Sequence, residues 1–92
     1  MAVTVHLSGH LRTFSNGELR VTIEGDLASV AEVLGALWMR HPALRDRILD
    51  DQGEIRTHVN IFDGSNDVKR LDGLSTMMRS DELHIFNAVS GG

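Results

Sequence analysis

The stretch SVAEVLGALWMRHP, residues 29–42, decides the fold class because it predicts the only long helix of this chain. Ser29 stands three residues before Glu32, the spacing of a capping box, in which a hydroxyl and a carboxylate satisfy free N–H groups at a helix start. Apolar residues recur at helical intervals and would form one stripe against a core: Val30, Val33, Leu34, Leu37 and Trp38. Because Pro42 disfavours helical geometry in the residue before it, we expect the helix to end near residue 40 or 41.

Two strands are expected before this helix. Apolar and polar residues alternate over residues 2–8 and again over residues 19–23, which is the period of a strand with one buried face. A turn signal at Asn16-Gly17 lies between them. The pattern predicts an antiparallel hairpin with a long connection.

Further strands are expected after the helix. Short helical turns are predicted near residues 44–49, a third strand over residues 58–62 and a last strand around residues 83–86. Asp63-Gly64 is a strong turn signal that should end the third strand, and Val68 is expected in a short edge strand. The chain is therefore predicted to be an α+β domain in which a mixed sheet of four or five strands packs on one main helix. The second face of that sheet should be open.

Composition excludes several classes of protein. The formal charge is −4, whereas a nucleic-acid binder normally concentrates Lys and Arg, so no nucleic acid is expected as a partner. Cysteine is absent, which excludes disulfides, thiolate metal sites and a side-chain thiol nucleophile. No apolar run approaches the roughly 20 residues that span a bilayer, and the N-terminus lacks the pattern of a secretion signal. We expect a cytoplasmic protein without a membrane partner.

The C-terminal residues AVSGG, 88–92, combine small side chains with two final glycines. Glycine has no Cβ, so a Gly91-Gly92 end can enter a narrow channel and present an unshielded carboxylate. We therefore expect a folded domain over residues 1–87 and a flexible tail over residues 88–92, and we place the function in the tail. The alternative is a frayed terminus with no role.

This order of elements, ending in Gly-Gly, resembles the ubiquitin-like β-grasp sulfur carriers. That family includes the small subunit of molybdopterin synthase and carrier proteins of thiamine and cysteine biosynthesis. The resemblance covers nearly the whole chain. Ser80 and Asn87 stand where the family often has Gly and Pro. The stretches that carry the resemblance are RHP (40–42), HVNIF (58–62), DVKRLDGLST (67–76), DEL (81–83) and AVSGG (88–92).

The resemblance implies chemistry at Gly92, the second residue of the Gly91-Gly92 pair. A ubiquitin-activating-like adenylyltransferase would use ATP and Mg²⁺ to convert the carboxylate to an acyl-adenylate, and a sulfur donor would leave a thiocarboxylate. A biosynthetic enzyme of the molybdopterin, cysteine or thiamine type would accept the sulfur. The chain would bind no cofactor itself, which agrees with its lack of a GxxxxGK[ST] phosphate loop. It would be a protein co-substrate, either a free carrier or a subunit of molybdopterin synthase.

Strand alternation predicts where such partners dock. If residues 83 and 85 face the helix, the residues between and beside them face outward. Outward aromatic side chains are typical of protein contacts, although each could instead be covered by a loop. The predicted partner-binding residues lie on this face and in the tail: Phe62, Phe86, His84, His58, Ala88, Val89 and Ser90.

Two other interpretations stay open. The chain could be a ubiquitin-like modifier conjugated to lysines through Gly92, and its sole lysine, Lys69, argues against long self-linked chains. It could also be an interaction domain with an idle tail.

His6, His58 and His84 could form a three-imidazole zinc site on geometry alone. Solvated or interface histidines are the favoured interpretation, so no metal site is predicted.

Overall fold

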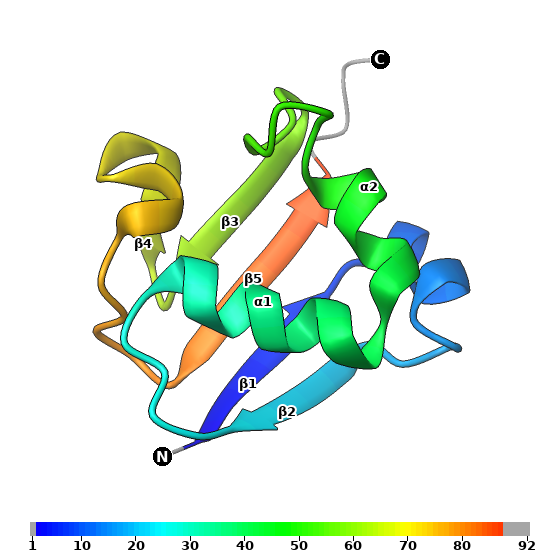
Figure 1. Ribbon diagram of the computed structural model, residues 1–92, viewed down its shortest axis with the longest axis horizontal. Helices are drawn as coiled ribbons and strands as arrows, with labels where there is room; N and C mark the ends of the chain where they lie inside the picture. The colour runs from blue at the N-terminus through cyan, green and yellow to red at the C-terminus, as the bar shows by residue number, and fades with distance from the viewer. Residues whose placement is uncertain (1, 88–92) are drawn as a thin grey trace.

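A five-stranded sheet is the frame of the computed structural model, which describes residues 2–87 (Figure 1). The strand order is β2-β1-β5-β3-β4, and the parallel pair β1·β5 makes the sheet mixed because the other neighbours are antiparallel. The first and last strands of the domain therefore lie side by side at its centre. The expected α+β fold class is confirmed. The strands are β1 (Ala2–Leu7), β2 (Arg20–Glu24), β3 (Val59–Asp63), β4 (Asn66–Asp67) and β5 (Glu82–Asn87).

The main helix, α1 (Val30–Arg40), crosses one face of the sheet (Figure 1). It begins as predicted, because the Ser29 hydroxyl accepts a hydrogen bond from the Glu32 N–H at 3.2 Å. The Glu32 carboxylate in turn accepts from the Ala28 N–H at 3.3 Å. Arg40 closes the last turn by donating to the Thr22 carbonyl of β2 at 2.7 Å. Across residues 2–87, no helix combines the length and the apolar character needed to cross a membrane.

The core lies between α1 and the inner face of the sheet. The predicted helical stripe is buried except for Trp38, which is only partly covered. The sheet contributes alternate residues of each strand, as a one-sided sheet must. Alternation therefore leaves the opposite side chains of β1, β3 and β5 on the open face. The buried apolar residues of the sheet are Val3, Val5, Leu7, Val21, Ile23, Val59, Ile61, Leu83 and Ile85.

Short helical turns fill the connections. A 3₁₀ turn, η1 (Gly9–Phe14), occupies the long β1–β2 connection. The turns expected near residues 44–49 are present as η2 (Pro42–Leu44) and α2 (Arg45–Ile48). Val68 begins the 3₁₀ turn η3 (Val68–Arg70) instead of lying in the edge strand, so that prediction is wrong. A further 3₁₀ turn, η4 (Gly73–Ser75), lies between η3 and β5.

The reason for the error at Val68 lies in the residue before it. The Asp67 carboxylate accepts from the Lys69 N–H at 2.9 Å, which stabilises a turn start. Val68 is fully buried there, so its apolar side chain packs in the core although its backbone is in a 3₁₀ turn and not in a strand.

Asp63 stands where β3 ends, as the turn signal predicted, and its carboxylate has a further structural role. It is the last residue of β3 and is only 1% exposed. Its carboxylate accepts hydrogen bonds from the Arg79 N–H at 2.8 Å, the Ser80 N–H at 3.1 Å and the Ser80 hydroxyl at 2.6 Å. The Ser80 hydroxyl accepts from the Glu82 N–H at 3.2 Å. Asp63 and Ser80 thus hold the turn from which β5 starts.

Candidate functional site

Strand β5 carries the candidate site because it supplies residues of the open face and is the last described element before residues 88–92. Leu83 and Ile85 are buried beneath the sheet, and Glu82, His84 and Phe86 alternate with them on the open face. The strand lies between β1 and β3 and ends at Asn87, the last described residue. The predicted tail residues lie outside the described residues: Ala88, Val89, Ser90, Gly91 and Gly92.

An aromatic pair occupies the open face where β3 and β5 meet. The ring centroids of Phe62 and Phe86 are 5.5 Å apart and the ring planes are tilted by 33°. Phe86 is 37% exposed and Phe62 is half-buried. Aromatic rings in this arrangement offer a large apolar contact area at a fixed position. Both residues are placed outward as predicted, and their docking role stays a prediction.

His58 is placed differently from the other predicted docking residues. It lies in the turn before β3, so it does not continue the outward row of that strand. The exposed His58 instead lines a groove of about 400 Å³ with Arg47, Phe14 and Asn87. The Arg47 guanidinium stacks over the Phe14 ring at 4.2 Å from its centroid. This groove borders the last described residue before the tail.

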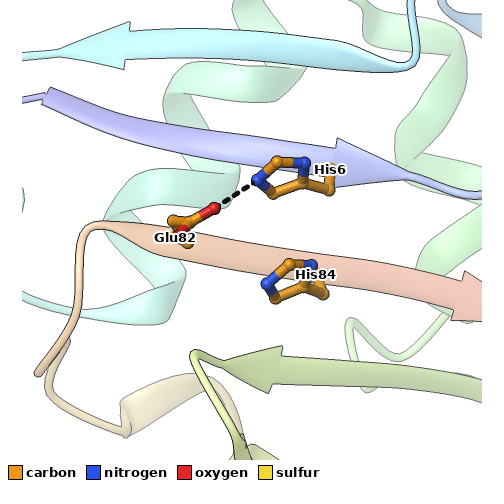
Figure 2. A group of neighbouring side chains, drawn as sticks. All are labelled: His6, Glu82 and His84. Atoms are coloured by element: carbon orange, nitrogen blue, oxygen red, sulfur yellow. Dashed lines mark hydrogen bonds and ion pairs between the residues drawn. The ribbon is translucent and has the colours of Figure 1, made fainter.

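His6 is a residue of the open face that the predicted docking set does not contain. Its ring stacks on His84, with centroids 4.5 Å apart and planes 12° apart. Its Nε2 lies 2.7 Å from Glu82 Oε1 (Figure 2). Alternation over residues 2–8 places His6 on this face, but only the parallel register of β1 with β5 brings it to His84.

Lys69 matters for the modifier interpretation because it is the sole lysine. Its Nζ donates hydrogen bonds to the backbone carbonyls of Arg56 at 3.1 Å and Thr57 at 3.0 Å. A conjugating enzyme would have to break both contacts to use this amine as an acceptor.

Comparison with known proteins agrees with the fold. No protein-family model matches the chain. Small archaeal modifier protein 1 of Haloferax volcanii is 40% identical over 74 residues, which cover 80% of each chain. The crystal structure of SAMP1 from H. volcanii superposes with a TM-score of 0.83 and 31% identity over 100% of both chains.

Two bacterial structures are similarly close. A chain of the Amycolatopsis orientalis BexX/CysO complex matches with a TM-score of 0.83 and 30% identity, covering 98% of this chain and 99% of that one. Mycobacterium tuberculosis CysO matches with a TM-score of 0.83 and 29% identity over 95% and 99%. The archaeal and bacterial relatives share one mixed-sheet architecture with this protein. The chain therefore belongs to the ubiquitin-like β-grasp family of small modifier and sulfur carrier proteins.

Proposed function

We propose that this protein carries sulfur as a thiocarboxylate on Gly92 and donates it to a biosynthetic enzyme. The carboxylate would attack the α-phosphate of ATP and release pyrophosphate, leaving an acyl-adenylate. A sulfide equivalent would then attack the acyl carbon, expel AMP and leave the thiocarboxylate. The observation that carries the proposal is the Gly91-Gly92 pair, which follows β5 closely in a chain that is 40% identical to a small modifier protein.

Activation requires a second protein in this proposal. A carboxylate is a poor electrophile and, as a chain terminus, is ionised at neutral pH, so ATP must activate it. A ubiquitin-activating-like adenylyltransferase would supply the sites for ATP and Mg²⁺. From Ala88 to Gly92, five extended residues reach about 16 Å, enough to enter an active site while the domain docks outside.

The open face of the sheet is the proposed docking surface for that enzyme and for the sulfur acceptor. Phe62 and Phe86 form its apolar centre, and His84 lies directly opposite Phe62 in the strand register. Aromatic side chains in the centre of an interface commonly contribute much of the binding free energy. One matched relative comes from a complex between BexX and CysO, which supports a carrier that works by docking.

The second candidate function is protein modification through Gly92. The names of the archaeal relatives favour it, because both are small archaeal modifier proteins. The two activities share the adenylation step and differ in the nucleophile, which is a sulfur species in one and a lysine amine in the other.

Intact-mass spectrometry tests the carrier proposal. The protein is incubated with its cognate activating enzyme, ATP and sulfide, and its mass is expected to rise by the difference between one sulfur and one oxygen. A variant lacking Gly92 is the control and should keep its mass. An unchanged mass for the intact chain, with no adenylate trapped when sulfide is omitted, would refute the proposal. Gly-Gly remnants on lysines of other proteins in the native cell would support the modifier function.

The docking surface is tested in the same assay. Phe86→Ala should raise the KM of the activating enzyme for this protein by about tenfold. Losing an aromatic side chain at the centre of an interface costs about 1–2 kcal/mol of binding free energy. Met39→Ala removes an apolar side chain that is 86% exposed on α1, away from the open face, and should leave the KM unchanged. Equal effects of the two substitutions would contradict this placement of the surface.

A further inference from the structure

Three metal-ligating side chains meet on the open face, in the arrangement of Figure 2. His6 on β1 and Glu82 and His84 on β5 each offer a donor atom, and these atoms all lie within 4.8 Å of one another. We propose that His6, Glu82 and His84 form a binding site for a divalent transition-metal ion of the zinc type. The site is independent of the sulfur chemistry and requires neither the tail nor an activating enzyme.

The donor set suits such an ion. Zn²⁺ binds imidazole nitrogen and carboxylate oxygen at about 2.0–2.2 Å, and sites with three protein ligands keep one position open. Ideal tetrahedral donors at that radius are about 3.3 Å apart. The pair His6 Nε2 and Glu82 Oε1, now at 2.7 Å, would therefore open slightly. The two imidazoles would turn out of their parallel stack so that their lone pairs converge.

The backbone holds these residues in position while their ends remain free to adjust. His6 and His84 are direct partners in the parallel register, and Glu82 is two residues from His84 on the same face. Val5, Leu7, Leu83 and Ile85 anchor the two strands to the core from below. The side chains of His6 and Glu82 are 32% and 53% exposed, so the small rotations required meet little steric resistance.

The charges near the site are mixed, because Arg20 on β2 lies opposite His6 in the strand register and the donor set itself is anionic. Glu82 gives the site one negative charge when the two imidazoles are neutral, and the whole chain has a formal charge of −4. His84 lies opposite Phe62, so the site borders the aromatic pair. Its open coordination position would be filled by water in the free protein. The zinc site considered from the sequence needed His58, whose place is taken here by Glu82.

The first test is calorimetric titration of tag-free, metal-free protein with Zn²⁺ near neutral pH. The expected result is saturable binding of one ion per chain, weakened by about tenfold or more in His6→Gln, His84→Gln and Glu82→Gln. His10→Gln and His58→Gln are matched controls, because both remove an exposed histidine outside the cluster, and they should keep the affinity. Binding should also weaken in acid, since metal ligation requires neutral imidazole.

Nitrogen chemical shifts of the histidine rings give a second readout that does not depend on affinity. Zn²⁺ should move the ring signals of His6 and His84 and leave those of His10 and His58 in place. Circular dichroism of each metal-free variant checks that it is folded, and Glu82→Gln, at the most exposed ligand, tests the site even if a histidine variant unfolds. Absence of saturable binding, or binding that disappears only in the control variants, would overturn the proposal.

Discussion

Replacing Asp63 by alanine should destabilise the domain strongly, although a turn residue would ordinarily tolerate the change. The carboxylate is 1% exposed and accepts three hydrogen bonds from Arg79 and Ser80. A buried donor left without an acceptor costs about 1–3 kcal/mol. Water can reach part of this turn because Ser80 is only half-buried, so we take the lower value for each donor. The three unpaired donors should then lower the free energy of unfolding by about 3 kcal/mol.

Urea unfolding measures this loss. A domain of this length has a total stability of about 5–14 kcal/mol, so the variant should still fold. With a urea dependence of about 1–3 kcal/mol per molar, the midpoint should fall by about 1–3 M. Asp81→Asn is the control, because Asp81 is exposed nearby, and its effect should stay within about 0.5 kcal/mol. A loss below about 1 kcal/mol for Asp63→Ala would refute the assigned role of the carboxylate.

Three further substitutions test the fold. Ser29→Ala removes the helix cap and should lower the free energy of unfolding by about 1 kcal/mol. Gly64→Ala should cost about 1–2 kcal/mol, measured by thermal unfolding, because Gly64 has a φ of 59° and an added Cβ would lie 3.3 Å from the Ser80 hydroxyl oxygen. Leu37→Ala should cost about 2–5 kcal/mol in urea because Leu37 is fully buried, whereas Met39→Ala on the exposed side of the same helix should cost less than about 0.5 kcal/mol. An unchanged midpoint for either glycine or leucine variant would contradict the packing described.

Local chemistry was enough to predict the main helix and most strands. Ser29 and Glu32 lie within one turn of each other, so their spacing is meaningful before any tertiary contact forms. The alternation around Leu83 and Ile85 likewise assigned Phe86 to the open face, because side chains of a strand point to opposite faces in turn. The final glycine pair also indicated a function for the tail, on which the proposed function depends.

Two features of the fold were not evident from the sequence patterns. The turn signal at Asp63-Gly64 correctly predicted the end of β3, but it did not indicate that donors 16 and 17 residues away bind the buried Asp63 carboxylate. Val68 appeared to belong to a strand, but the capped turn at Asp67 and burial in the core placed it in a 3₁₀ turn. At Val68 the strand propensity was weak compared with the Asp67 cap and burial in the core.

The sequence by itself determined the α+β class, the main helix and the outward row of β5, because each depends on residues close together in the chain. Only the tertiary structure decided that His6 stacks on His84 and contacts Glu82, which is 76 residues away. That contact requires β1 and β5 to pair in parallel and in one register. The pairing follows from burying both strands in the centre of the sheet, a property of the whole core that no single segment contains.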